Sequence, residues 1–169
     1  MPARRSAILG LVAGLCACGF RPLLKEVDDQ GVRSELAAIE VQGLQSSRLG
    51  QLVHNQLLDE LNPTGAAVPA RYLLSVQVRE RSSALGIQLD NTVTRYNLLL
   101  TARFHLLDRK DRRLLFSSTV SRIASYDVQR APFATLVAEQ DAERRAAEEV
   151  GRDIMARLAA HFSRQKSAT

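Results

Sequence analysis

Tryptophan is absent from the sequence, and aromatic side chains are few, at 5% of 169 residues. The core must therefore be built from leucine, valine, isoleucine and alanine. With 46% hydrophobic and 24% charged residues, the composition is that of a folded protein and not of a disordered one. The length suits one domain and is too short for two comfortable ones.

Catalytic and phosphate-binding motifs are also missing. The chain has no glycine-rich phosphate loop and no G-x-S-x-G, and no candidate nucleophile has an obvious base. Its histidines, His54, His105 and His161, fall on different predicted elements without the spacing of metal ligands. The acidic residues between positions 139 and 149 are better explained as the solvated face of a helix. We therefore expect no enzyme activity, no metal and no cofactor.

Acidic residues are outnumbered, which gives the chain a formal charge of +5, and arginine supplies nearly all of the basic side chains. Such a balance suits an anionic partner. Phosphate-bearing lipid, nucleic acid and an acidic protein face all fit this description, and the charge does not choose among them.

Only two cysteines occur, Cys16 and Cys18, and they directly follow an apolar run. Two arginines precede the run, which is too short to span a bilayer, so residues 1–17 are predicted to be a secretory signal peptide. A buried N-terminal helix is the alternative. The residues from Leu15 to Cys18 resemble the bacterial lipobox, in which a small residue precedes the modified cysteine.

In that frame Cys18 is the lipidated residue, and Cys16 is removed with the signal peptide. Cys16 itself fits badly, because bulky Leu15 would stand immediately before the cut. Acyl chains on Cys18 would anchor the protein without a transmembrane helix, since each buried methylene adds about 0.8 kcal/mol of membrane affinity. Gly19 follows in place of aspartate, which implies delivery to the outer membrane.

The mature chain is predicted to comprise a lipidated N-terminus and extended tether (18–34), one domain (35–163) and a disordered tail (164–169). Apolar residues alternate in the expected strands, and they recur every three to four residues in the expected helices. The strands are expected at 37–42, 72–80, 92–108 and 113–125, and in the last of them Leu114, Phe116 and Val120 are expected to point inward. One helix is expected after Ser46 or Ser47, and the other carries an apolar stripe from Ala142 to Phe162. This β-α-β-β-β-α order predicts an α+β two-layer sandwich with two helices on one face of a four-stranded sheet.

The other face of the predicted sheet is polar, with Arg79, Arg95, Arg103 and several threonines, serines and asparagines. Between Arg81 and the next strand lies a long connection in which Leu85, Ile87 and Leu89 alternate with small or polar residues. This segment could be a mobile arm that adds to another protein, or it could extend the two strands into a long hairpin, and the two interpretations are compatible. The arginines could grip phosphates, or they could keep the polar face soluble.

The start of the mature chain, Cys-Gly-Phe-Arg-Pro-Leu at residues 18–23, resembles that of lipopolysaccharide-assembly lipoproteins, the LptE or rare lipoprotein B family. The order of elements, Tyr96 early in the long third strand and the alanine-rich closing helix are also similar. The Arg-Pro-Leu version looks like the alphaproteobacterial form. The resemblance covers nearly the whole mature chain.

This resemblance implies a non-enzymatic outer-membrane lipoprotein. Members of the family plug the β-barrel that inserts lipopolysaccharide (LptD), assist its folding and bind lipopolysaccharide. The family's lipid-contacting basic residues lie near the hairpin tip and just before the last helix, where this chain has Ile87-Gln88-Leu89 and Leu136-Val137-Ala138. The candidate contacts to lipopolysaccharide or barrel are therefore Arg79, Arg81, Leu85, Ile87, Leu89, Arg95 and Arg130.

Two other functions compete with this interpretation. The protein could be an auxiliary lipoprotein of an ABC-type lipid transporter. It could also bind nucleic acid through its basic sheet face, but that would require a cytoplasmic chain, so we expect no nucleic-acid partner.

Overall fold

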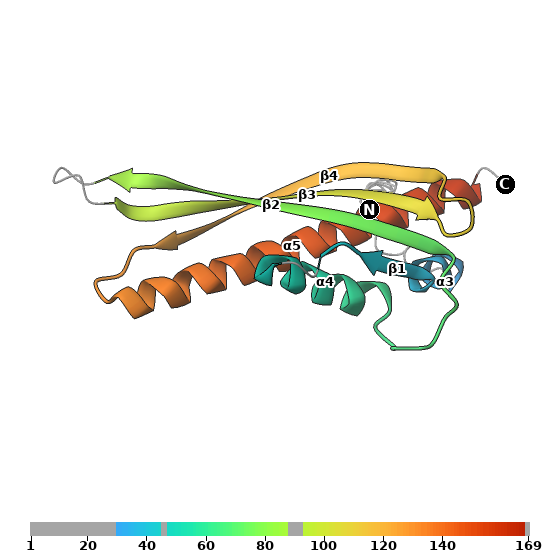
Figure 1. Ribbon diagram of the computed structural model, residues 1–169, viewed down its shortest axis with the longest axis horizontal. Helices are drawn as coiled ribbons and strands as arrows, with labels where there is room; N and C mark the ends of the chain where they lie inside the picture. The colour runs from blue at the N-terminus through green and yellow to red at the C-terminus, as the bar shows by residue number, and fades with distance from the viewer. Residues whose placement is uncertain (1–29, 45–46, 88–92, 168–169) are drawn as a thin grey trace, which may run out of the picture.

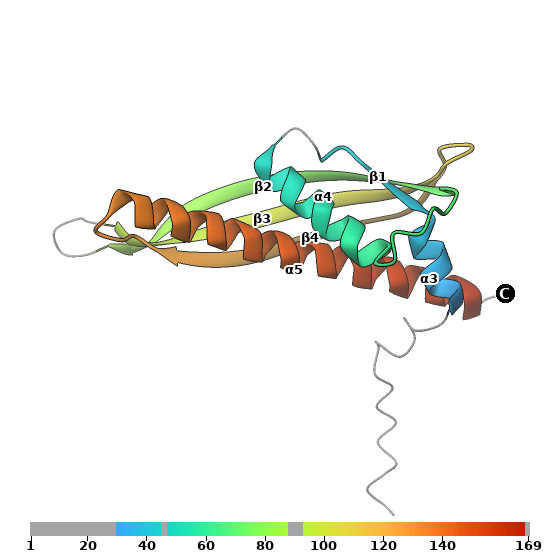
Figure 2. The same cartoon turned by 90° about the horizontal axis from the view of Figure 1, so that it is seen from below.

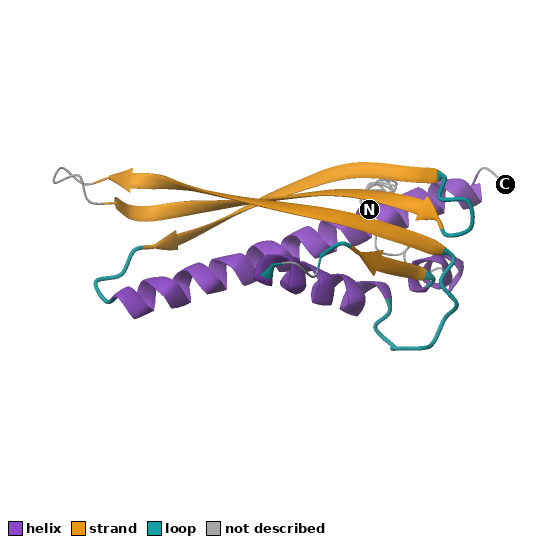
Figure 3. Ribbon diagram, in the orientation of Figure 1, coloured by secondary structure: helices purple, strands orange, loops and turns teal. Residues whose placement is uncertain are grey.

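Two layers make up the structure, a computed structural model that describes residues 30–44, 47–87 and 93–167 (Figure 1). All the helices among the described residues lie on one side of a four-stranded sheet, as Figures 1 and 3 show. The predicted α+β sandwich is therefore confirmed. In chain order the elements are α3 (Gln30–Ala37), β1 (Ile39–Gln42), α4 (Arg48–Leu61), β2 (Tyr72–Ile87), β3 (Val93–Asp108), β4 (Leu114–Asp127) and α5 (Pro132–Ser167).

The strands follow the sheet in chain order, β1-β2-β3-β4. Strand β1 pairs in parallel with only the first four residues of β2, and α4 makes the crossover between them. Strands β2, β3 and β4 form a long antiparallel meander. Because the meander extends far beyond β1, the molecule is elongated, with the β2–β3 tip at one end and α3 at the other (Figures 1 and 2).

Strict alternation along β3 assigns the two faces of the sheet. Leu98, Leu100, Ala102, Phe104 and Leu106 are fully buried beneath the helices. The residues between them point to the opposite face, since successive side chains of a strand alternate. The sequence pattern predicted this division correctly.

The helix layer is built on α4 and α5. Ser47 caps α4 by accepting a hydrogen bond from the Gly50 backbone N–H, and Val53 and Leu57 are fully buried. Helix α5 runs the whole length of the sheet (Figure 2). It contacts α4 closely at Gly151, where a side chain would collide with Gln56.

The segment through residue 34 was expected to be extended, but residues 30–34 are the first turns of α3. Val32 and Leu36, four residues apart, are buried, and that burial favours a helix. The helix is also fastened to the sheet, because Glu35 accepts a hydrogen bond from the Tyr72 hydroxyl at 2.7 Å and pairs with Arg71 at 2.5 Å.

The ends of two elements and the orientation of one side chain also differ from the prediction. Helix α5 starts at Pro132, before the Leu136-Val137-Ala138 segment expected to precede it, and continues through Ser167 into the expected disordered tail. Strand β2 continues to Ile87, so the long-hairpin interpretation is confirmed that far. Leu114 was expected inward, but it is 54% exposed, because a β-bulge at Leu106 and Leu107 changes the register there.

Candidate functional site

The sheet face opposite the helices carries the charged residues that the sequence singled out. Arg79 and Arg81 lie on β2, Arg103 lies on β3, and all three side chains are exposed. Arg79 is directly opposite Thr101, and Arg103 is opposite Gln77, so Arg79 and Arg103 are diagonal neighbours on one face. We call Arg79, Arg81 and Arg103 the arginine band.

A shallow hollow of about 130 Å³ lies in the middle of this face. Its lining combines guanidinium, hydroxyl and amide groups from three strands. The residues are Gln77, Arg79, Thr101, Arg103 and Thr119. Sequence reasoning placed Arg103 on the polar face but did not select it as a contact, because only the pairing of β2 with β3 brings it beside Arg79.

Ion pairing distinguishes the arginine band from Arg95 on the same face. Within the described residues, no carboxylate lies within ion-pair distance of Arg79, Arg81 or Arg103. Arg95, also predicted as a contact, instead donates from Nε to Asp127 Oδ1 at 2.7 Å. This hydrogen bond raises the pKa of Arg95 and lowers that of Asp127. The charge of Arg95 on β3 is therefore neutralised by Asp127 on the adjacent strand β4.

The other predicted contacts are spread over the end of the molecule that bears the hairpin tip. Leu85 is 61% exposed on β2, and Arg130 is exposed in the connection between β4 and α5. Ile87 is the last residue of β2. Leu89 and the expected lipidation site Cys18 lie outside the described residues, so their contacts stay predictions.

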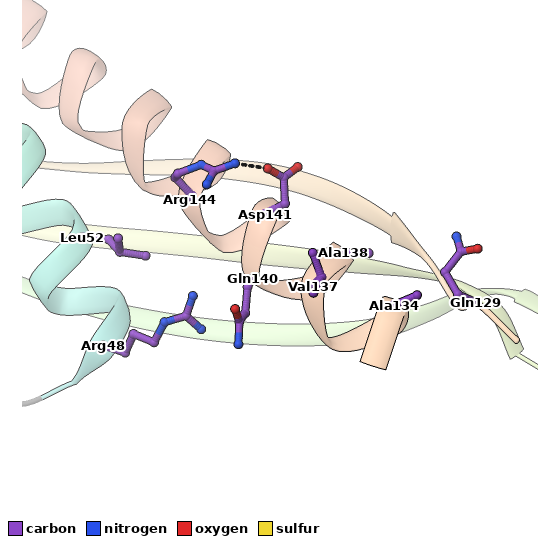
Figure 4. A pocket seen from close by; sticks show the side chains of 9 residues that line it. All are labelled: Arg48, Leu52, Gln129, Ala134, Val137, Ala138, Gln140, Asp141 and Arg144. Carbon is purple, nitrogen blue, oxygen red and sulfur yellow. Dashed lines mark hydrogen bonds and ion pairs between the residues drawn. The ribbon is translucent and has the colours of Figure 1, made fainter. Parts of the chain in front are cut away.

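A second surface, which the sequence analysis did not find, lies where α5 extends past the start of α4. Its groove has a volume of about 590 Å³ (Figure 4). The lining residues are Arg48, Leu52, Gln129, Ala134, Val137, Ala138, Gln140, Asp141 and Arg144. Phe133 beside it is 76% exposed, and Leu136 and Val137 are about half exposed. Their spacing of three and four residues was the available sequence signal.

Charges around this groove are largely paired. Arg48 Nη1 lies 2.8 Å from Glu143 Oε2. Arg144 pairs with Asp141 (Figure 4). Burial raises the pKa of Glu143, and the positive charge of Arg48 opposes that effect. The groove therefore offers apolar surface with little free charge, in contrast to the sheet face.

The histidines do not assemble into a site. His54 lies on α4, His105 on β3 and His161 on α5, where His161 stacks on Phe116 with ring centroids 4.8 Å apart. Within the described ranges, no group of three or more histidine, cysteine, aspartate or glutamate side chains could hold a metal ion. None of the described helices combines the length and the apolar character needed to cross a membrane.

Comparison with known proteins points to one family. A sequence model for one family, LptE, described as lipopolysaccharide-assembly, matches residues 36–158. No protein with a curated description matches the chain.

Several solved structures share the fold. A candidate lipoprotein from Caulobacter crescentus is 33% identical, with a TM-score of 0.68 over 80% of this chain and 97% of that one. The rare lipoprotein B of Shewanella oneidensis is 14% identical, with a TM-score of 0.58 over 76% of this chain and 98% of that one. A minor lipoprotein from Acinetobacter baumannii is 20% identical, with a TM-score of 0.54 over 73% of this chain and 90% of that one.

Proposed function

The chain belongs to the lipopolysaccharide-assembly (LptE) family, and from this premise we propose that it is a non-catalytic outer-membrane lipoprotein that docks inside a lipopolysaccharide-inserting β-barrel of the LptD kind. In this role it assists assembly of the barrel and supports delivery of lipopolysaccharide to the outer leaflet. Its signal peptide is residues 1–17, and its anchor is an acylated Cys18 facing the periplasm.

One observation supports the docking role above the others: the long sheet has a polar face that none of the described helices covers (Figure 3). The helix-covered face forms the core, whereas the other face presents hydroxyls, amides and the arginine band. A wide outer-membrane barrel has a polar, water-filled interior. A polar sheet can lie against such a wall without leaving apolar surface in water.

The open face also carries an exposed apolar side chain on its edge strand, β4. Ile123 of β4 is 61% exposed, and it lies in the same row as Leu99 and Arg81. Apolar side chains ringed by polar ones are common at the centres of protein interfaces. We therefore place the main barrel contact around Ile123, with Leu85 as a second contact near the hairpin tip.

The test is co-purification of the barrel from solubilised outer membranes with tagged full-length protein. Ile123→Asp and Leu85→Asp should each reduce recovery of the barrel, because docking would bury an unpaired carboxylate. Leu58→Asp is the matched control, since Leu58 is 46% exposed on α4, on the helix side. An unpaired buried charge costs at least about 1–3 kcal/mol, or roughly a tenfold loss of affinity or more.

Equal recovery with all three variants would contradict docking through the open face. Failure of the wild-type protein to recover any large β-barrel would contradict the barrel role itself, and recovery of a membrane-bridging transporter would replace it. Cys18→Ser tests the anchor separately. This variant should fold but leave the outer membrane on fractionation, and mass spectrometry of the wild type should find an acylated residue 18 at the N-terminus.

A further inference from the structure

Strand β4 is one edge of the sheet, and part of its backbone faces away from every other strand. The Val128 N–H, just after β4, donates to the Thr94 carbonyl oxygen at 2.9 Å, so these two opposite residues are a hydrogen-bonded pair. Bonded and non-bonded pairs alternate along an antiparallel ladder. The even-numbered residues of β4 from Phe116 to Tyr126 therefore bond to β3, and the odd-numbered residues point their N–H and C=O groups out of the sheet edge.

One of these outward groups is engaged by the helix layer. Arg145 of α5 donates from Nη2 to the Ser125 carbonyl oxygen at 3.1 Å, which agrees with the outward direction of an odd-numbered residue. No hydrogen bond within the described ranges reaches the outward backbone groups of residues 117–123. The odd-numbered residues of this stretch are all exposed. We call residues 117–123 the free edge.

The free edge lacks the features that commonly keep an edge strand from pairing with another chain. Those features are lysine, proline, bulges and inward-pointing charges. The free edge reads Ser-Ser-Thr-Val-Ser-Arg-Ile, without lysine or proline. Its charged residue, Arg122, is held by Asp153 of the helix layer at 2.6 Å, and the bulge of this ladder lies beyond the free edge, near Leu114. Another strand can therefore approach along residues 117–123.

The opposite edge of the sheet is protected. Beyond Ser75, where β1 ends, β2 has no strand of the described chain on its outer side. There β2 carries consecutive charged residues at positions 79–81, and its register shifts between Ala84 and Gly86. Charges and a bulge both hinder the addition of a flat strand. The difference between the two edges identifies β4 as the side where a partner strand can add.

We propose that the free edge binds an extended polypeptide segment of another protein, which adds to the sheet as an additional strand beside β4. The outward N–H and C=O groups of a strand edge are recognised by another backbone in the same extended form. The identity of that protein, the barrel, rests on the proposed function. Wall strands of a closed barrel already have a neighbour on each side. The bound segment is therefore a part of the barrel chain outside its wall strands.

A second copy of this chain is a poorer occupant. Antiparallel pairing of two free edges centred on Val120 would place Arg122 of one copy opposite Ser118 of the other. Ser118 already accepts a hydrogen bond from Arg157 of α5 at 2.5 Å, so two guanidinium groups would meet there. Like charges opposite one another destabilise a strand pair. The chain also carries a net charge of +5, so two copies repel each other.

The test removes one outward donor and leaves the ladder to β3 intact. Ser121→Pro deletes the N–H of an odd-numbered residue, and proline is tolerated on edge strands where the N–H faces away from the neighbouring strand. Ser121→Ala removes the same hydroxyl but keeps the N–H, so the comparison between the two variants isolates the backbone. Tagged full-length proteins are compared by recovery of the barrel from solubilised outer membranes, after urea unfolding has shown that each variant is folded.

A control proline is placed on the protected edge. The Arg109 N–H donates to the Arg71 carbonyl oxygen at 3.0 Å, so the odd-numbered residues of β2 up to Ser83 bond to β3 and the even-numbered ones face outward. Ser82 is one of these outward residues and is exposed. Ser82→Pro therefore makes the same substitution at the other edge of the same sheet, and it should leave recovery of the barrel unchanged.

Ser121→Pro should lower recovery of the barrel at least about fivefold below that of Ser121→Ala, because one ladder bond is lost and the bound segment keeps an unpaired carbonyl. If Ser121→Pro does not fold, Thr119→Pro compared with Thr119→Ala makes the same test. A photo-crosslinking amino acid in place of Thr119 should join the barrel chain at a segment outside its wall strands, as read by mass spectrometry of the crosslinked peptide.

Equal recovery with Ser121→Pro and Ser121→Ala, or an equal loss with Ser82→Pro, would overturn strand addition at the free edge. The proposed function would survive that result, because wild-type protein would still recover the barrel. Failure of wild-type protein to recover any barrel would refute both. A wild-type dimer in analytical ultracentrifugation that Ser121→Pro converts to a monomer would show that a second copy occupies the edge, and would overturn the barrel segment as its occupant.

Discussion

Three consecutive leucines on β3 provide a sharp test of which sheet face is open. Leu98 and Leu100 are fully buried beneath the helices, whereas Leu99 lies between them on the open face and is only partly covered. Replacing each leucine with alanine changes the chain in the same chemical way at neighbouring positions of one strand. The intrinsic strand preference changes equally in all three, so the difference among them reports burial.

The expected magnitudes follow from that burial. Leu98→Ala and Leu100→Ala each remove buried methylene groups and leave a cavity, which should lower the free energy of unfolding by about 2–5 kcal/mol. Leu99→Ala leaves no enclosed cavity and should cost less than about 1 kcal/mol. With a urea dependence of about 2 kcal/mol per molar, the buried variants should unfold at urea concentrations about 1–2.5 M lower, and Leu99→Ala at a concentration less than about 0.5 M lower.

Urea unfolding followed by circular dichroism measures all three midpoints. If Leu99→Ala loses as much stability as its two neighbours, the assignment of faces is wrong. A strand shifted by one residue turns every side chain to the other face. Arg103 would then point toward the helices, and neither the open arginine band nor the hollow that it lines would exist.

Two further predictions concern the helix layer. Burial raises the pKa of Glu143 above 4.5, so the folded state holds the proton of this group more tightly than the unfolded state does. Ionisation of Glu143 should therefore lower the free energy of unfolding as the pH rises above that value. Glu143→Gln should remove this contribution to the pH dependence of stability, measured by urea titrations from about pH 4 to about pH 7. Gly50→Ala should lower the melting temperature despite the better helix propensity of alanine, because the new Cβ would collide with the Leu44 carbonyl oxygen. We expect the free energy of unfolding to fall by about 1–3 kcal/mol. Gln51→Ala is the control and should be neutral or slightly stabilising.

Most of the fold could be predicted because the local patterns and the tertiary packing agree. The alternation around Phe104 and a serine cap at Ser46 or Ser47 were predicted; the structure confirms the alternation and identifies Ser47 as the cap. Helix α3 was missed because Gly31 and the polar residues around it are typical of a turn. Its helical form depends on the burial of Val32 and Leu36 against elements that are distant in the sequence, α4 and α5.

The site was harder to predict than the fold because it depends on register between strands. Alternation places Arg79 and Arg103 on the polar face, but only the pairing of Gln77 with Arg103 makes the two arginines neighbours. Likewise, Arg95 looked equivalent to the others, yet a carboxylate 32 residues away neutralises it. A single sequence does not state which strand residues lie opposite one another, so free and paired arginines could not be told apart.

The two ends of the elongated molecule give an anchored chain a defined reach. Helix α5 has 36 residues and therefore extends about 54 Å at about 1.5 Å per residue. The described chain begins at α3, opposite the β2–β3 tip (Figure 2), and the eleven residues 19–29 can span at most about 40 Å. Since the hydrocarbon core of a bilayer is only about 30 Å thick, a domain that stands upright with α3 at the near side of that core would carry Leu85 past its far side.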